Sequence, residues 1–197
     1  MKERWKEIWR SLKREKGAML GLSLLVLVLL MALVAPLAPY GPKERDTAAG
    51  TAGPSGDHWL GTDASSYDVF SRLLYGARTS LLTGVAAIAL ALLVGVPMGA
   101  ISGYAGGWTD GLIMRSVDVM LAFPSVVLAI AIATLLADRT VTTVIVAVGV
   151  VNIPLIARQV RASVLQVREQ DYVMAGRAIG MSPLRILARH VLPNCVA

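Results

Sequence analysis

The sequence has little of the chemistry that disulfide-stabilised domains, metalloproteins and enzymes use. It contains one cysteine, Cys195, which excludes an intrachain disulfide framework. Its two histidines, His58 and His190, are too few and too far apart along the chain to predict a metal site. The GxxxxGK[ST] pattern of ATP-binding P-loops is missing as well. We therefore predict no catalytic residue, no metal ligand and no cofactor bound by this chain.

Charged residues are also scarce, at 16% of 197 residues, whereas hydrophobic residues make up 55%. Soluble domains have about a quarter of their residues charged. The net charge is +6, but the basic residues gather at the N-terminus and beyond Arg158, where they flank apolar segments. This distribution is typical of membrane topology. It predicts the lipid bilayer, and not nucleic acid, as the partner surface.

Four apolar segments predict an all-α, polytopic membrane protein. They cover residues 18–39 and about 81–100, 119–137 and 141–156, the last three lying in a core of residues 80–197. Basic residues follow the fourth segment, at Arg158, Arg161 and Arg168. Because the positive side is cytoplasmic and is regained after an even number of spans, we expect a cytoplasmic N-terminus.

Polar segments flank the first span on both sides. Residues 1–17 place Trp5, Ile8, Trp9 and Leu12 at helical spacing among basic residues, which predicts a cytoplasmic amphipathic helix on the membrane surface. A contact with a partner subunit is the alternative for this helix. Residues 40–79 are punctuated by glycine and proline and are expected to be extracytoplasmic. Within them, residues 68–78 predict a helix lying along the outer surface, with Val69, Leu73 and Gly76 on one stripe.

Two spans contain residues that interrupt a regular apolar helix. Phe123 and Pro124 break the third span early, and Asn152 and Pro154 interrupt the fourth. All four are candidates for the transport pathway or for helix packing. An amide inside a membrane helix needs a partner, and we expect Asn152 to form an interhelical hydrogen bond.

Other residues predict how the spans pack and where they end. Gly84, Gly95 and Gly99 allow another helix to approach the second span closely, and we expect that contact within the subunit. Arg115 and Asp118 are three residues apart ahead of the third span. Their spacing predicts an ion pair at the membrane interface.

The apolar sequence gives way near the C-terminus to two short helices, in residues 169–194. Gly180 predicts a left-handed stop to the first helix. Ser182 is suited to cap the second helix and Pro183 to occupy its first position. The second helix is then amphipathic, with one apolar stripe at helical spacing made of Leu184, Leu187, Ala188 and Val191.

These residues carry a resemblance to a known family. Ala175, Gly180, Leu192 and Pro193 occupy the positions of the EAA loop of ABC importer permeases. The ordered string around them resembles the dipeptide, oligopeptide and nickel branch: Asp171, Tyr172, Val173, Arg177, Ala178, Arg185, Ile186, Arg189, His190, Val191, Leu192, Pro193 and Asn194. A second block, in residues 58–63 and 68–78, resembles the same branch.

The chain departs from the family pattern at four positions. Met174 stands where the motif has glutamate, and Gly176 where it has its second alanine. Ser66 and Tyr67 replace the usual Gly-Arg before Asp68. The first departure questions an ionic contact of the loop, and the last pair predicts an altered local contact.

The resemblance implies the transmembrane domain of a type I ABC importer, with four of an expected six spans, so that the chain is expected to be shortened at its C-terminus. In this family the helix pair docks on the ATPase and couples nucleotide-driven closure to the membrane helices. The implied coupling residues are Asp171, Tyr172, Met174, Ala175, Gly176, Gly180, Ser182, Pro183, Leu184, Leu187, Val191, Leu192 and Pro193. The implied location is a prokaryotic inner membrane.

The resemblance also implies partners. They are a second homologous permease, two ATPase subunits that hold ATP and Mg²⁺, and an extracytoplasmic solute-binding protein. The sequence does not choose between dipeptides, oligopeptides, glutathione-like compounds and nickel chelates as the transported solute.

Two other classes of membrane protein compete with this interpretation. A secondary transporter or channel without an ATPase accounts for the helix breaks and for Asn152, but not for the ordered loop of residues 169–194. A membrane-embedded enzyme needs converging polar groups within its spans, and the sequence offers only Asp118 near an interface. Co-purification with an ATPase distinguishes the importer from both.

Overall fold

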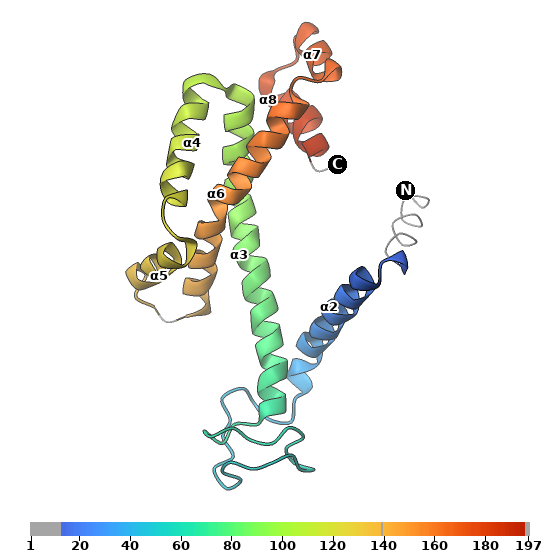
Figure 1. Ribbon diagram of the computed structural model, residues 1–197, viewed down its shortest axis with the longest axis vertical. Coiled ribbons are helices and arrows are strands. Elements are labelled where there is room, and N and C mark those ends of the chain that lie inside the picture. The colour runs from blue at the N-terminus through green and yellow to red at the C-terminus, as the bar shows by residue number, and fades with distance from the viewer. Residues whose placement is uncertain (1–12, 139, 196–197) are drawn as a thin grey trace. The chain divides into compact units, whose positions relative to one another are not determined.

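The computed structural model describes residues 13–138 and 140–195, and in these residues the chain forms helices, turns and loops without a named β-strand. Most of the helix predicted for residues 1–17 lies outside the described residues. The chain divides into two compact units, Met1–Leu82 and Thr83–Ala197 (Figure 1).

The first unit begins with one long apolar helix. Helix α2, Lys16–Val34, contains no buried residue and ends in a 3₁₀ turn, Ala35–Leu37. Its length and composition suit a membrane span. A helix that exposes leucine and valine on all sides fits a lipid surface or a partner helix.

Helix α3, Val69–Ala105, follows an irregular segment and is 37 residues long. The predicted surface helix of residues 68–78 and the predicted span 81–100 are therefore parts of one continuous helix. The helix continues through Thr79 and Ser80. Within it the Thr79 hydroxyl donates to the Tyr75 carbonyl at 2.9 Å. Ser71 and Leu74 are buried in this stretch whereas Leu73 is 47% exposed, so the stripe of Val69, Leu73 and Gly76 is not the buried side of the helix.

The second unit reverses direction sharply after α3. Gly106 (φ +67°) and Gly107 (φ +55°) have left-handed backbone angles, so α4, Gly107–Leu121, starts almost at once. Residues 103–111 are thus largely helical.

The predicted third span, residues 119–137, is broken at Phe123 and Pro124, as the sequence predicts. Helix α4 ends at Leu121, and α5, Ser125–Leu135, leaves at an angle of 92° (Figure 1). Pro124 explains the break, because it has no N–H to donate and it disfavours a helical conformation at Phe123. The pair forms either one broken span or a re-entrant loop.

Helix α6, Val141–Val167, is longer than the predicted fourth span. The Thr140 hydroxyl accepts a hydrogen bond from the Thr143 N–H at 3.4 Å, at the N-terminus of the helix. Pro154 lies inside the helix and is buried. The helix continues past this proline to Val167.

Glycines bring α3 and α6 into backbone contact. A Cβ built on Gly95, Gly99 or Gly103 meets the carbonyl oxygen of Ile153, Ala157 or Arg161 at 3.0, 2.3 and 3.0 Å, respectively. Close packing of Gly95 and Gly99 within the subunit is confirmed, and Gly103 extends the pattern by one turn. Gly84 makes no such contact, since its added Cβ meets nothing within 4 Å.

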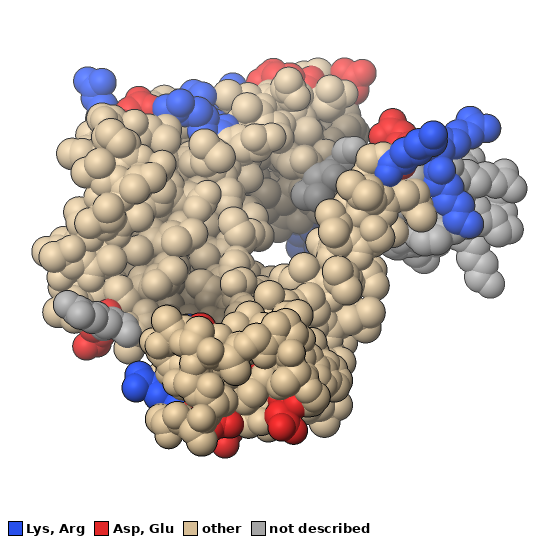
Figure 2. Space-filling model, turned by 60° about the horizontal axis from the view of Figure 1, so that its bottom comes forward, with Lys and Arg blue, Asp and Glu red and all other residues tan. Residues whose placement is uncertain are grey.

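The described helices form a polytopic membrane protein. Helices α2, α3 and α6 are each long and apolar enough to cross a bilayer, and the α4–α5 pair is a fourth candidate. Figure 2 shows broad uncharged surfaces in view, with charged atoms in small groups. Such surfaces suit contact with lipid or with other membrane helices.

Candidate functional site

The candidate site is the loop of residues 169–194, which follows directly from α6. It contains α7, Asp171–Ala178, and α8, Pro183–Ile186, followed by a π-helical turn, Leu187–Val191, and a 3₁₀ turn, Leu192–Cys195. The predicted order of two short helices is present. Pro193 lies within the final 3₁₀ turn, beyond the α-helical residues.

Glycine ends the first helix as the sequence predicts. Gly180 has φ +78°, and its N–H donates to the Arg177 carbonyl at 3.0 Å. The Met181 N–H donates to the Gly176 carbonyl at 3.1 Å. This pair of bonds is a Schellman motif, which satisfies carbonyls that the helix end would otherwise leave unpaired.

The second helix begins where the sequence predicts, but without the expected side-chain bond. Ser182 occupies the N-cap position with extended backbone, and Pro183 is in the first turn. The Ser182 side chain accepts no capping hydrogen bond. The Ile186 N–H instead donates to the Ser182 carbonyl at 3.0 Å.

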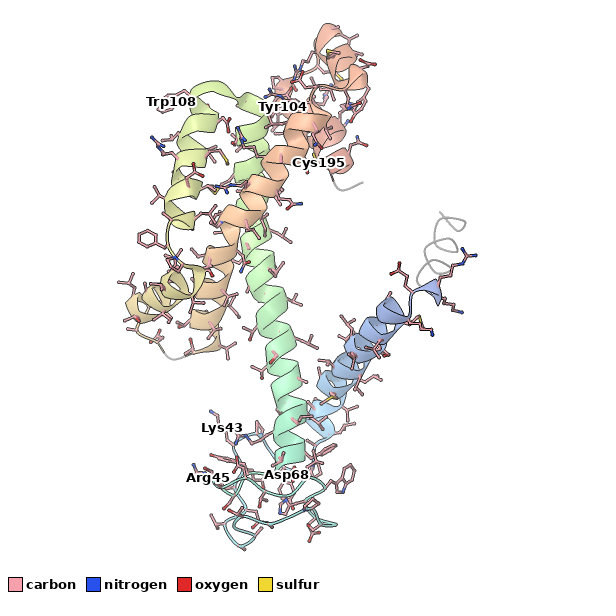
Figure 3. The ribbon with its side chains drawn as sticks, in the orientation of Figure 1. Lys43, Arg45, Asp68, Tyr104, Trp108 and Cys195 are labelled. Atoms are coloured by element: carbon pink, nitrogen blue, oxygen red, sulfur yellow. The ribbon has the colours of Figure 1, made fainter. Side chains whose placement is uncertain are left out.

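A small apolar core holds the loop together and joins it to α6. Val164 of α6 packs with Val173, Ile186 and Val191 of the loop, and each is at most 1% exposed. Partly buried apolar residues surround this core: Tyr104, Val160, Val167, Met181, Leu187 and Cys195. Tyr104 and Cys195 are labelled in Figure 3, on α3 and in the final turn. The loop is thus packed onto the ends of two membrane helices.

The apolar stripe expected in the second helix is wrong. Leu184 is 76% exposed, whereas Ile186 and Val191 are buried. The π-helical turn explains the difference, because i→i+5 hydrogen bonding brings residues five apart toward one face. Leu187 remains partly buried at the edge of the core.

The buried and exposed sides of the loop differ in what they offer a partner. Tyr172, Met174, Ile179 and Leu184 are 44%, 48%, 78% and 76% exposed. Gly176 and Val191 are buried, Leu187 and Leu192 are intermediate, and the other predicted coupling residues are exposed: Asp171, Ala175, Gly180, Ser182, Pro183 and Pro193. The loop therefore presents large apolar side chains from both helices.

The two departures from the motif have separate structural consequences. Met174 puts an exposed thioether where the motif has a carboxylate, so this position offers apolar contact instead of an ion pair. A Cβ added to Gly176 meets Met181 Sδ at 3.4 Å and Ile186 carbons at 3.8 Å or more, which is ordinary van der Waals contact. Gly176 and alanine therefore fit the same packing.

An apolar hollow lies beside the exposed leucine. Its volume is about 190 Å³, and it is lined by the end of α3, by α8 and by the start of the π-helical turn: Ile101, Tyr104, Ala105, Pro183, Leu184 and Leu187. The guanidinium of Arg177 lies 5.5 Å from the centre of the Tyr104 ring. The exposed side chain of Leu184 therefore packs beside the end of α3.

Ion pairs tie the three helices together near this loop. Arg161 of α6 donates two hydrogen bonds of 2.6 Å to the carboxylate of Asp110 in α4. The Ser102 hydroxyl of α3 donates to the same carboxylate. Arg168 donates to the Gly103 carbonyl at 2.7 Å and pairs with Glu169 at 2.9 Å. Sequence reasoning missed the Asp110–Arg161 pair because its members are 51 residues apart.

Two other predicted contacts are corrected. Asp118 pairs with Arg158 of α6 at 2.7 Å, and not with Arg115. Asn152 Nδ2 donates to the Val148 carbonyl at 2.8 Å within its own helix, so the expected interhelical bond is wrong. The other pathway candidates lie elsewhere: Phe123 is 53% exposed beside Pro124 at the α4–α5 break, and Pro154 is buried within α6.

The described part of the chain contains no group of three histidine, cysteine, aspartate or glutamate side chains arranged to hold a metal ion. The chemistry that the loop offers is noncovalent: an exposed apolar surface, braced by a buried core and by ion pairs. Such a surface suits docking to another protein.

Two family descriptions match parts of the chain. Residues 95–197 match the family described as binding-protein-dependent transport system inner membrane component. Residues 3–54 match the N-terminal transmembrane domain of oligopeptide transport permease C.

Curated relatives are similar along nearly the whole chain. The chain is 42% identical over 196 residues to dipeptide transport system permease protein DppC of Alkalihalophilus pseudofirmus. It is 37% and 40% identical over 195 residues to glutathione transport system permease protein GsiD of Pectobacterium atrosepticum and of Escherichia coli. Each match covers 98% of this chain and 64% of the relative's length. The chain belongs to the family of binding-protein-dependent transport system inner membrane components.

Proposed function

We propose that this chain is a permease subunit of an ATP-binding-cassette importer and that residues 169–194 couple it to a separate ATPase. The observation that carries the proposal is the outward apolar surface of Tyr172, Met174, Ile179 and Leu184, which is fixed to α6 through a buried core. A rigid attachment allows movement of the loop to reach the membrane helices. Family membership supports the importer over a secondary transporter or channel.

Movement of the loop reaches α6 and the other two helices by different routes. The loop continues from α6 along the backbone, and Tyr104 of α3 packs against its core. The Asp110–Arg161 pair extends the connection to α4. Displacement of the docked loop would therefore shift α3, α4 and α6 together, because a packed core and paired charges transmit strain.

The assembly that we propose contains more than this chain. A second homologous permease completes the pathway, two ATPase subunits bind ATP and Mg²⁺, and an extracytoplasmic binding protein delivers the solute. This chain supplies no catalytic group and binds no cofactor in that scheme. The N-terminus and the coupling loop are cytoplasmic, in an inner membrane, and residues 40–68 face the other side.

The proposed solute is a short peptide or a related compound. The relatives' names specify dipeptide and glutathione transport. Both solutes are small, amide-linked and zwitterionic. A pathway used by this chain is expected to accept that chemical class, with the binding protein selecting among its members.

The test is co-purification of the chain with the ATPase and permease encoded beside it, from detergent-solubilised membranes. Aspartate at Ile179 or Leu184 should reduce retention of the ATPase at least about tenfold, since desolvating a charge at an apolar contact costs more than 1.4 kcal/mol. Leu184→Asp is a sharper probe than Leu187→Asp, because Leu187 also packs in the core.

The matched control is Leu60→Asp, which changes an equally apolar residue that is 50% exposed and lies outside the loop. It should leave ATPase retention unchanged, and membrane insertion should be the same for all variants. Equal retention by wild type, Ile179→Asp and Leu184→Asp would count against the docking surface.

A further inference from the structure

Residues 40–68 contain a buried histidine that the coupling proposal does not use. His58 is 3% exposed and belongs to the second block of family-like sequence. Its ring stacks on Tyr40, with ring centres 4.8 Å apart. A buried imidazole needs hydrogen-bond partners for its ring nitrogens, and the identity of those partners determines its charge.

Both ring nitrogens of His58 face carboxylate oxygens. Nδ1 lies 3.0 Å from Oδ1 of Asp68, and Nε2 lies 3.3 Å from Oδ2 of Asp46. A neutral imidazole has one N–H and one lone pair, so one nitrogen would direct its lone pair at a carboxylate oxygen. The doubly protonated ring donates to both. The geometry therefore selects the imidazolium form.

The two carboxylates are themselves held by the backbone. Asp68 Oδ2 accepts the Ser71 N–H at 2.7 Å in the first turn of α3. Asp46 Oδ1 accepts the N–H groups of Ala48 and Ala49 at 3.1 Å. His58 thus joins a fixed turn to the start of a helix. Figure 3 shows Asp68 at that end of α3.

We propose that protonated His58 is a proton-operated clasp, which fastens the segment of residues 40–68 to the N-terminus of α3 and releases it when the ring loses a proton. The position of this clasp on the extracytoplasmic side rests on the proposed function. Its chemistry does not, because the three groups and their contacts lie within one unit of the chain.

The groups that face His58 determine how the clasp responds to pH. They are Asp46 from the preceding turn, Asp68 from the start of α3, and the stacked ring of Tyr40. The hydrogen bond to Asp68 raises the pKa of His58 above its ordinary value, against the opposing effect of burial, and Asp46 adds to the rise. Burial, followed by nearby carboxylates, raises the pKa of Tyr40, which keeps its phenol neutral.

The direction of the pH dependence follows from linkage. The pKa of His58 is raised on folding, so its protonation adds to the stability of the folded segment. This stabilisation is complete below about pH 6.5 and is lost as pH rises through the raised pKa. The pKa of Asp46 is lowered, first by the Ala49 N–H. Burial by itself raises the pKa of Asp68, but the hydrogen bonds from Ser71 and His58 together outweigh it and lower the pKa. The stabilisation from these two carboxylates is lost only as pH falls through their lowered pKa values. The clasp is therefore strongest in mildly acid solution.

The first experiment is a ¹⁵N NMR titration of the full chain in detergent micelles, with ¹⁵N-labelled histidine. The chain has only two histidines, so in His190→Gln every histidine signal comes from His58. Both ring nitrogens of His58 should be protonated at pH 6.5, with a midpoint above that value, and Asp46→Asn should lower the midpoint. A His58 ring that is neutral at pH 6.5, or a midpoint unchanged by Asp46→Asn, would overturn the proposal.

The second experiment measures release of the segment. In a Cys195→Ser background, maleimide labels Ala52→Cys, which is half-buried, and Thr51→Cys, its exposed neighbour. Dividing the labelling rate of Ala52→Cys by that of Thr51→Cys removes the effect of pH on the thiol itself. This ratio should rise severalfold as pH passes above the His58 midpoint. In His58→Gln the ratio should not change with pH. The same pH response in His58→Gln would refute the clasp and would leave the ATPase pull-down untouched.

Discussion

Replacing Gly99 with alanine is the sharpest test of how α3 and α6 pack. The added Cβ would lie 2.3 Å from the Ala157 carbonyl oxygen and 2.9 Å from Val160 Cβ. Ordinary van der Waals contact begins at 3.4 Å, so the nearest contact is roughly 1 Å too short. The obstructing atom belongs to the backbone and cannot rotate away. The two helices must therefore separate along this seam.

The expected cost follows from overpacking in well-packed cores, about 1–3 kcal/mol. For a chain of this length, each kcal/mol lowers the melting temperature by roughly 2–4 °C. We therefore expect Gly99→Ala to melt about 2–12 °C below wild type. Gly95→Ala and Gly103→Ala should cost less, because their closest backbone contacts are at 3.0 Å.

The assay is thermal stability of the detergent-solubilised chain, measured as the fraction that remains monodisperse in size-exclusion chromatography after heating. Gly84→Ala is the matched control, since it lies in the same helix and its Cβ meets nothing within 4 Å. Alanine favours helix over glycine by up to about 1 kcal/mol, so this variant should melt at or above the wild-type temperature. Equal melting temperatures for Gly99→Ala and Gly84→Ala would refute the packing argument.

Two further predictions concern single contacts. Asp110→Arg should destabilise the chain by about 1–3 kcal/mol, because the Asp110 and Arg161 side chains share two hydrogen bonds of 2.6 Å. In a double-mutant cycle, adding Arg161→Asp should restore part of that stability. Additive losses would argue against a direct pair. Ser66→Gly should stabilise the chain by about 1 kcal/mol in the same melting assay, because Ser66 has φ +61° and glycine adopts that angle without strain; a lower melting temperature would contradict this.

The structure shows what the Ser66–Tyr67 departure from the family pattern changes. Ser66 adopts a left-handed conformation that suits the family's glycine. The guanidinium groups of Arg45 and Arg72 lie over the Tyr67 ring, at 4.9 and 4.8 Å from its centre. An arginine here would bring three positive charges together. The altered local contact predicted from the sequence is therefore an aromatic one.

Local signals in the sequence were enough for part of the candidate site. Glycine at position 180 predicts a left-handed helix end because only glycine adopts positive φ without cost, and the structure has it there. Pro183 predicts a helix start by the same kind of local argument. The buried face of the second helix was missed, because the π-helical turn changes its register.

By itself, the sequence determined that this is a helical membrane protein with an amphipathic loop at residues 169–194. Hydrophobic length and charge placement act locally and need no partner elsewhere in the chain. Only the tertiary structure decided which groups meet: the α4–α5 angle of 92°, the approach of Gly99 to the Ala157 carbonyl, and the pairing of Asp110 with Arg161. These three features depend on how segments that are distant in the sequence pack together. The position of a carbonyl or a charge in the sequence does not show which group it will contact.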